Sequence, residues 1–332
     1  MDVIHANASR MELGYIKYVT QLDAEISQAQ GAALNENSWQ IILDDDTWAD
    51  DPILWRHYIY AIGTEFGGPV EYIKHSTASK QITLSGPTWR GMLMRKVIEP
   101  PPGQAYLTVS AMEANAAVAL LVGSMFGSVI GVSTDDTNVD VSASFRYDNM
   151  LYGIEAMLAG AGLALAISYD QTARKAILSA RPINDLSNVI DLSQDYGVNM
   201  TSAEGRIDGY NHVVGLGAGE LLDRDIVNRY RLDDGTITGA PPEWAGTDLD
   251  VVAVLDYTSA ESADKVIESA DKKLLEYAPR TGIEMDPVDI DLLLGDVVGA
   301  RDRLTGMQVS ATVIGKILKI TESGVSIQTK VG

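Results

Sequence analysis

Residues 294–332 read LGDVVGARDRLTGMQVSATVIGKILKITESGVSIQTKVG, and this stretch decides what kind of fold the chain has. Apolar residues alternate with polar ones from Gln308 to Val313 and again from Val325 to Val331. Strict alternation places one set of side chains on each face of a sheet, so it predicts two half-buried strands. The segment Glu322–Gly324 supplies the turn between the last two strands. The stretch is therefore predicted to belong to a sheet.

The first third of the stretch is richer in glycine and contains two arginines, in the segment GARDR at 299–303. Two guanidinium groups could hold an anion. In a chain with many acids, exposed arginines more often pair with carboxylates in a solvated turn. We favour the turn, and the anion site stays open as the alternative.

The N-terminal hundred residues also have the period of strands. Leu13 to Ser27 alternates in the same way, and Trp39 to Leu43 forms a further short strand. Val70 to His75 and Gln81 to Ser85 flank the polar segment STASK, which predicts a hairpin. The segment EPPPG at 99–103 then stops the pattern, because three consecutive prolines cannot continue a helix or a central strand. We place a domain boundary there.

The middle region, 101–204, contains two helix-then-strand units, which predicts a compact α+β domain. Asp148 can cap the second helix by accepting hydrogen bonds from its first amides, and Gly160 is placed to end it. The predicted elements are the helices Met112–Met125 and Asn149–Ala159 and the strands Leu163–Tyr169 and Ala176–Ala180.

An uncharged segment, AAVALLVGSMFGSVIGV at 116–132, tests whether the chain enters a membrane. It lies at the lower limit of roughly 17 residues for a spanning helix. Glycines and serines interrupt it and no basic flank anchors it, so we predict a buried helix followed by a strand. The first residues, MDVIHANASR, lack the basic segment and apolar core of a secretory signal.

The last region, 205–332, returns to sheet around one helix. Tyr210 to Leu216 and Asp225 to Leu232 are predicted strands on either side of GAGELLDR. The predicted helix runs from Ala263 to Tyr277 and has an apolar stripe at spacings of three and four. Ser262 can cap its start, and Pro279 lies beyond its end. The stripe, most simply core packing, consists of Ala263, Val266, Ile267, Ala270, Leu274 and Tyr277.

Charge and composition exclude several classes of protein. The 332 residues carry 46 acids against 25 bases, a formal charge of −21, and no cysteine. Such a surface repels nucleic acid and anionic membranes. The absence of cysteine removes disulfides, thiol nucleophiles and thiolate metal sites.

No motif in the sequence assigns a catalytic, cofactor-binding or metal-binding residue. GLGAGE at 215–220 lacks the spacing of a dinucleotide loop and is interpreted as a glycine-rich hairpin loop or bulge. DDDTWADD at 44–51 and TDDTNVD at 134–140 miss the spacing of a calcium loop and are interpreted as solvated turns. Carboxylate pairs for glycoside cleavage stay open, since proximity in space is invisible in a sequence. The four histidines are scattered along the chain: His5, His57, His75 and His212.

Four stretches carry a family resemblance through their order and spacing. LGYIKYVTQLDAEIS at 13–27, SGPTWRGMLMRKVIEPP at 85–101, YNHVVGLGAGELLDRDIV at 210–227 and the closing stretch are similar to the hub proteins of bacteriophage baseplates. The resemblance is to the siphophage tail-tip hub that forms the N-terminal module of tail-associated lysins, and the central hub of contractile phages is similar. Longer members continue into peptidoglycan-cleaving or receptor-binding modules. This chain stops where the hub stops, so we expect any lytic activity to come from another chain.

The resemblance implies an α+β, β-rich fold with two barrel-like β domains and a small α/β domain. Residues 1–100 would form the first barrel-like domain, open to completion by later strands. Residues 101–204 would form the α+β domain, and residues 205–332 the second barrel-like domain with its helix near 262–277. The closing stretch would then be framework, and its arginines turn residues or subunit contacts.

The resemblance also implies a structural, non-enzymatic role without cofactors. The chain would form a homotrimer in the virion, assembled in the host cytoplasm, that joins the sixfold tail tube and distal tail protein to the tip and closes or lines the DNA channel. Its other partners would be the tape measure protein and receptor-binding or lytic tip proteins, with no specific nucleic-acid binding and no membrane segment. Two alternatives stay open, a hub subunit of a contractile injection system and a cell-wall-degrading tail enzyme.

Overall fold

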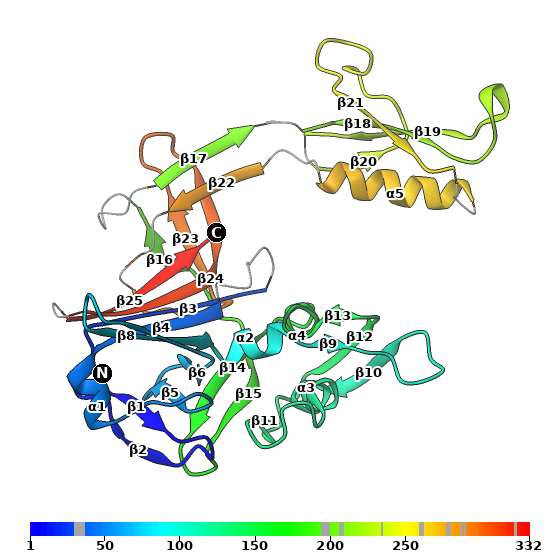
Figure 1. The fold of residues 1–332 in the computed structure, drawn as a ribbon. Coiled ribbons are helices and arrows are strands. Elements are labelled where there is room, and N and C mark those ends of the chain that lie inside the picture. Colours follow the sequence, from blue (N-terminus) through cyan, green and yellow to red (C-terminus); the bar gives the residue numbers. More distant parts are fainter. Residues whose placement is uncertain are drawn as a thin grey trace. The chain divides into compact units, whose positions relative to one another are not determined.

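The computed structural model describes residues 1–29, 37–193, 200–205, 209–233, 235–258, 262–276, 280–285, 288, 290–321 and 324–332 (Figure 1). Contacts divide the chain into two compact units. Unit 1 consists of Met1–Thr201 and Ile283–Gly332, and unit 2 consists of Ser202–Gly282. The chain is β-rich with few helices, which confirms the fold class at this level.

An eight-stranded sheet forms the larger framework of unit 1. Its order is β16-β23-β24-β3-β4-β8-β7, with β25 paired to β24. The hairpins β7–β8 and β24–β25 are antiparallel, as the sequence predicted. The strands are β3 (Gln21–Ser27), β4 (Ser38–Asp44), β7 (Tyr72–Ser76), β8 (Gln81–Pro87), β16 (Asp185–Leu192), β23 (Val297–Arg301), β24 (Gln308–Thr321) and β25 (Gly324–Val331).

The long strand β24 joins the two ends of the chain. Its first half pairs with β23 up to Thr312, and its second half pairs with β3 from Gly315 onward. A register shift between Val313 and Gly315 adds one residue to the strand. A bulge of this kind reverses which parity faces the core. Accordingly, Val313 is buried before the shift and Leu318 is buried after it.

A second sheet, in the order β2-β1-β5-β6, shares a hydrophobic core with the first (Figure 1). Ile59 from this sheet and Leu22 from the large sheet are both buried in that core. A Cβ atom on Gly68 would lie 1.9 Å from the carbonyl oxygen of Pro87, so β6 and β8 approach where only glycine fits. The strands are β1 (Val3–Ala6), β2 (Glu12–Tyr15), β5 (Tyr58–Ala61) and β6 (Gly67–Pro69).

Helices and short strands from the middle of the sequence complete unit 1. A three-stranded sheet, β11-β15-β14, and the pairs β10–β12 and β9–β13 surround two helices, α3 and α4. Their core also contains Ile4, Tyr60 and Trp89, so it is continuous with the four-stranded sheet and with α2. The elements are α2 (Trp89–Met94), β9 (Val97–Ile98), β10 (Leu107–Glu113), α3 (Ala114–Val122), β11 (Ile130–Val132), β12 (Asp140–Phe145), β13 (Asp148–Asn149), α4 (Met150–Ala159), β14 (Leu163–Asp170) and β15 (Lys175–Pro182).

Unit 2 is a four-stranded sheet, β20-β19-β18-β21, with one helix on one face. The helix α5 (Ala263–Glu276) buries Val266, Ala270 and Leu274, members of the stripe that the sequence predicted. A Cβ atom on Gly215 would lie 2.7 Å from Val266, so glycine lets the helix pack closely. The strands are β18 (His212–Leu216), β19 (Ile226–Arg231), β20 (Ile237–Thr238) and β21 (Val252–Asp256). Outside this sheet, β17 (Met200–Gly205) pairs with β22 (Arg280–Met285).

Several predicted boundaries shift in the structure. The segment from Leu13 to Ser27 is two strands, β2 and β3, rather than one. The first middle helix begins at Ala114, because Met112 still pairs across β10–β12. The cap of α4 is Asn149, whose side-chain oxygen accepts from the Tyr152 amide at 3.3 Å, whereas Asp148 accepts from the amide of Arg146.

Other predictions of elements are confirmed. Gly160 ends α4, and the uncharged segment 116–132 contains most of α3 and then β11. No helix in the described ranges is long and apolar enough to cross a bilayer. Tyr277, Pro279 and most of the turn at 322–324 lie outside the described residues.

One boundary between the compact units falls between Thr201 and Ser202, near the predicted boundary at 204, and none falls near residue 100. The pairing of β3 with β24 places strands from both ends of the sequence in one sheet. The core of the middle region is shared with residues from β1 and β5. The division into three domains, and the barrel-like character of two of them, stay predictions.

Candidate functional site

The glycine-rich segment 215–220 is a hairpin loop, as predicted. Gly215 and Leu216 pair with β19, and the Gly217 amide donates to Asp225 O at 2.8 Å across the loop. Gly219 has a φ of +98°, a conformation that favours glycine. The loop closes on its own backbone and forms no dinucleotide motif.

The segment GARDR at 299–303 differs from the predicted turn, because its first three residues lie in β23 and only Asp302 and Arg303 follow the strand. A Cβ atom on Gly299 would lie 2.5 Å from Ser187 O, so the position is a close contact between β23 and β16. Arg301 pairs with Asp191 at 3.0 Å, which agrees with the expected pairing to an acid.

The acidic segment 44–51 forms the short helix α1 (Asp45–Asp50) rather than a turn. The Thr47 amide donates to Asp44 Oδ1 at 2.6 Å, so Asp44 is the N-cap of this helix. The hydrogen bonds from Thr47 hold the pKa of the Asp44 carboxyl below its usual value. Asp45 and Asp46 lie in the first turn of α1, near the positive end of the helix dipole, which accounts for this part of the acidic cluster without a ligand.

The second acidic segment, 134–140, is a loop organised by Glu113. The carboxylate of Glu113 accepts from the amide and hydroxyl of Thr137 at 3.0 and 2.7 Å and from the Ala116 amide at 2.8 Å. Burial opposes ionisation, but these hydrogen bonds outweigh it and lower the pKa of Glu113 to about 2. In the described ranges, no cluster of three or more His, Cys, Asp or Glu side chains is arranged to hold a metal ion.

Two of the four histidines meet, which the sequence did not indicate. His5 Nε2 lies 2.7 Å from His57 Nδ1, and His5 Nδ1 lies 2.9 Å from Asp51 Oδ2. Burial and the neighbouring His5 lower the pKa of His57, against the opposing effect of Asp51. The two histidines meet because β1 pairs with β5. No spacing of residues in the sequence encodes that pairing, so the sequence carries no signal for this cluster.

The other two histidines lie in different surroundings. His75 lies on the exposed strand β7. His212 is buried in unit 2, where its ring nitrogens lie 3.0 Å from Asp250 Oδ1 and 3.1 Å from Asn228 Oδ1. Its ring stacks on Tyr230 at 4.2 Å between centroids. Each ring nitrogen of His212 therefore has a polar neighbour within the unit.

A buried arginine ties together three parts of unit 1. Arg90 of α2 is 1% exposed, and its guanidinium contacts Glu65, Glu155 of α4 at 2.6 Å and Leu165 O at 2.6 Å. Glu155 also accepts from the Ala29 amide at 2.7 Å. Burial raises the pKa of the Glu155 carboxyl, against the opposing effect of Arg90. Because each guanidinium nitrogen of Arg90 and each oxygen of the two carboxylates contacts a protein group, the cluster is structural.

A similar contact secures the closing stretch to the middle region. Arg181 of β15 donates to Asp296 Oδ1 at 2.7 Å and to Leu294 O at 2.6 Å. The Asn184 amide also donates to Asp296, at 3.1 Å. The first residues of the closing stretch are thus framework.

Two exposed apolar surfaces are suited to contacts with other proteins. In unit 1, Leu13, Tyr15 and Tyr18 are 51%, 59% and 70% exposed and line a groove of about 470 Å³ with Ile53. Large exposed apolar groups that cluster commonly mark protein interfaces. We call this the β2 surface.

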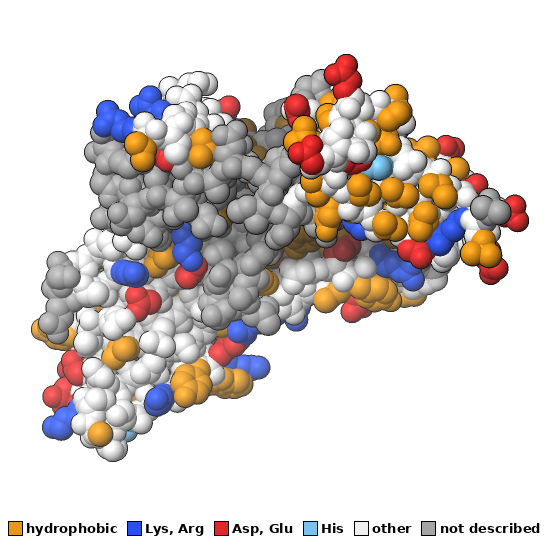
Figure 2. Space-filling view, turned by 90° about the horizontal axis from the view of Figure 1, so that it is seen from above, with side chains coloured by type: hydrophobic (Ala, Val, Ile, Leu, Met, Phe, Trp, Pro, Cys, Tyr) orange, Lys and Arg blue, Asp and Glu red, His pale blue; other side chains and the backbone are white. Residues whose placement is uncertain are grey.

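In unit 2, the sheet face opposite α5 carries the second apolar surface. By strand alternation Val252 and Val254 lie on the face opposite Ala253, which packs in the core with α5. Ile226 and Val254 are 59% and 58% exposed, and Figure 2 shows hydrophobic side chains gathered over the sheet of this unit. Both surfaces can bury apolar area in an assembly, and the sequence alone indicated neither.

Solved structures of phage tail proteins have a similar fold. The 43 kDa tail protein of prophage MuSo2 from Shewanella oneidensis aligns with a TM-score of 0.59 at 10% identity, covering 100% of this chain and 98% of that chain. A tail protein from Neisseria meningitidis MC58 gives 0.54 at 12% identity, covering 99% and 95%. A chain of the phage P2 baseplate in its activated conformation gives 0.50 at 9% identity, covering 100% and 99%. No family model and no curated protein matches this chain.

The chain therefore has the fold of phage tail and baseplate proteins, over nearly its whole length and nearly the whole length of theirs. At the level of fold, this confirms the resemblance to baseplate hubs that the sequence indicated. At 9–12% identity the likeness concerns the backbone arrangement.

Proposed function

We propose that this protein is a structural hub of a phage-type tail tip. The observation that supports it most directly is the end-to-end match to phage tail proteins, since it includes the sheet that β3 and β24 complete together. The predicted motifs fold into caps, strands and hairpin loops, so their residues serve the framework. Exposed apolar surfaces on both units supply area for contacts with other chains.

The proposed assembly is a homotrimer. Closed symmetric rings are the usual form of structural oligomers. The hub resemblance implies two barrel-like β domains in each subunit, so that three subunits present six to the sixfold tail tube. The proposed partners are the tube, the distal tail protein, the tape measure protein and receptor-binding or lytic tip proteins, within the virion.

Light scattering on the purified full chain tests the assembly. A trimer gives about 107 kDa, three times the 35.7 kDa of one chain. The three-fold symmetry of averaged electron micrographs is the second readout. A mass that stays at that of one chain up to high concentration, or a ring of six copies, would contradict the proposal.

The proposal includes a role for the acidic surface. Three chains, each with a formal charge of −21, carry a charge of about −63 before counterions bind. The repulsion between this charge and the phosphates of DNA extends over about 8–10 Å at moderate salt. A channel lined by carboxylates repels DNA and lets it pass, whereas basic groups would retain it through counterion release. If acidity served solubility alone, the acids would lie mainly on the outer surface.

Two alternatives have separate tests. A hub of a contractile injection system would have the same fold, and the neighbouring genes would separate it from a phage hub. A cell-wall-degrading enzyme would clear peptidoglycan in a zymogram. We expect no clearing, and alanine at Asp44, Asp46 or Arg303 to change stability or assembly at most.

A further inference from the structure

The strand β12 has one paired edge and one open edge. It pairs antiparallel with β10, for example at Ala143 and Val109. The sheet topology gives it no second partner in the described part of the chain. An unpaired edge presents a row of amides and carbonyls that can pair with another strand.

The backbone groups on the open edge can be assigned by alternation. The Ala114 amide donates to Val139 O at 3.0 Å, so residue 139 faces the β10 side. Successive residues of a strand point their N–H and C=O groups to opposite edges. Val141 and Ala143 therefore face β10, and Ser142 and Ser144 face the open edge.

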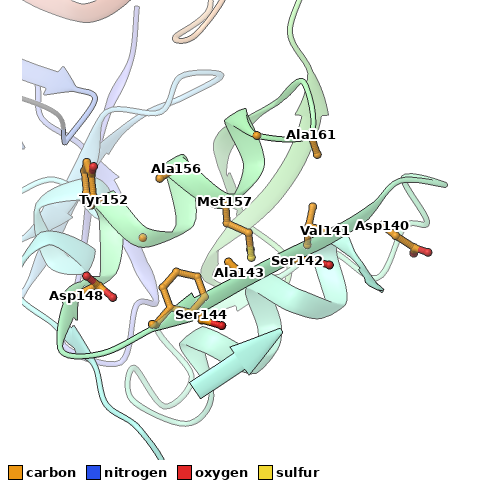
Figure 3. Close-up of a pocket in the computed structure, with 13 residues that line it drawn as sticks. Asp140, Val141, Ser142, Ala143, Ser144, Asp148, Tyr152, Ala156, Met157 and Ala161 are labelled. Atoms are coloured by element: carbon orange, nitrogen blue, oxygen red, sulfur yellow. The ribbon is translucent and has the colours of Figure 1, made fainter. Parts of the chain in front are cut away.

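A groove of about 520 Å³ runs along this edge, between β12 and α4 (Figure 3). Its volume lies within the roughly 300–1,000 Å³ of ligand pockets. Six residues of strand extend about 20 Å, so the open edge offers a complete strand-length of pairing. The groove is lined by Asp140, Val141, Ser142, Ala143, Ser144, Phe145, Asp148, Tyr152, Gly153, Ala156, Met157, Gly160 and Ala161.

The helix side of the groove leaves room for a polypeptide backbone. Tyr152, Ala156 and Gly160 recur every four residues, so they lie along one side of α4. Two of these three have almost no side chain. Met157 extends from α4 toward β12, and its position beside Ala143 gives the groove an apolar floor (Figure 3).

The charges at the two ends of the groove indicate what could bind there. Asp140 and Asp148 lie at opposite ends of the groove, and none of the described residues that line it is Lys or Arg (Figure 3). An incoming segment with a cationic residue at each end would match these carboxylates. Small apolar side chains between them would fit over Ala143 and Met157.

We propose that the groove between β12 and α4 binds an extended, basic-ended segment of another protein, which adds as a third strand to the β10–β12 pair. Backbone hydrogen bonds to Ser142 and Ser144 would supply affinity, and the apolar floor and terminal carboxylates would select the sequence. The geometry of the groove carries this inference, independently of the hub assignment.

A labelled peptide, acetyl-Lys-Val-Ala-Val-Ala-Arg-amide, tests the proposal on the full chain by fluorescence anisotropy. We expect a Kd below about 1 mM. Hydrogen exchange followed by mass spectrometry should slow at residues 140–145 when the peptide is bound. The same peptide with Glu at both ends should bind about tenfold more weakly, because both terminal contacts become repulsive.

Variants of the groove decide whether binding occurs there. Ala156→Trp fills the groove, and Ser144→Pro removes an amide that the β10 pairing does not use, so each should weaken binding at least about tenfold. Ala159→Trp is the matched control, since Ala159 is exposed on α4 but does not line the groove. Thermal unfolding checks that each variant is folded, and either groove variant suffices if the other is not. The proposal is overturned if wild type does not bind, if both groove variants bind as wild type does, or if exchange at 140–145 is unchanged.

Discussion

Arg90→Met should destabilise unit 1 far more than the loss of an ordinary ion pair. The guanidinium is 1% exposed and serves Glu65, Glu155 and Leu165 O together. Its removal leaves two largely buried carboxylates without a cation. Breaking a buried pair from one side costs about 3–5 kcal/mol. A loss of this size should move the urea midpoint down by about 1 M or more.

The loss should depend on pH in a defined direction. Burial already raises the pKa of Glu155 above its ordinary value of 4.5, and removing Arg90 raises it further. A carboxyl whose folded pKa is raised contributes stability that is present below the unfolded pKa and lost as pH rises through the folded pKa. The difference between Arg90→Met and wild type should therefore be larger at pH 7.5 than at pH 5.

Urea unfolding followed by tryptophan fluorescence measures both effects, because Trp89 is buried next to Arg90 in α2. The matched control is Arg95→Met, which breaks the pair of Arg95 with Glu71, where the side chains are 48% and 45% exposed. Exposed pairs contribute about 0–1 kcal/mol. If Arg90→Met costs no more than the control, or shows no dependence on pH, the role given to the buried cluster is wrong.

Three further outcomes are expected. Gly68→Ala should lower the free energy of unfolding by about 3 kcal/mol, because the new Cβ atom would lie 1.9 Å from Pro87 O. Gly160→Ala is the control and should change the free energy of unfolding little, because the nearest atom to its new Cβ lies at 3.5 Å. Chemical denaturation compares the two variants. The pKa of His57 is lowered in the folded protein, so the contribution of His57 to stability is fully present above the unfolded pKa of 6.5 and falls as pH drops through the folded pKa. In thermal unfolding scans from pH 7.5 to 5, His57→Gln should therefore lose less stability than wild type. Purified protein should not retard duplex DNA in a gel at moderate salt. A basic channel in the assembled particle would contradict the proposed role of the acidic surface in letting DNA pass, while leaving the hub proposal intact.

Local periodicity in the sequence predicted many of the strands and helices in the described ranges, but it did not indicate strands such as β1, β5 and β12. The alternation in β24 and β25 and the hairpin β7–β8 follow from a period of two, and the buried stripe of α5 follows from a period of 3.6. The resemblance to phage hubs depended on the order of these elements, and the shared fold confirms it. The charge and the absence of cysteine also follow from the sequence alone.

Only the tertiary structure shows which strands pair. That pairing in turn determines which residues share a hydrophobic core and which polar side chains meet. Every strand has the same period of two, so no local pattern specifies that β24 pairs with β3, which lies nearly 300 residues away in the sequence. Nor does a local pattern specify the bulge after Val313 that reverses which residues of β24 face the core. The meeting of His5 with His57 and the burial of Arg90 among carboxylates depend on the same long-range pairing. Local propensity acts over a few residues, whereas partners distant in sequence are chosen by the burial of a common core.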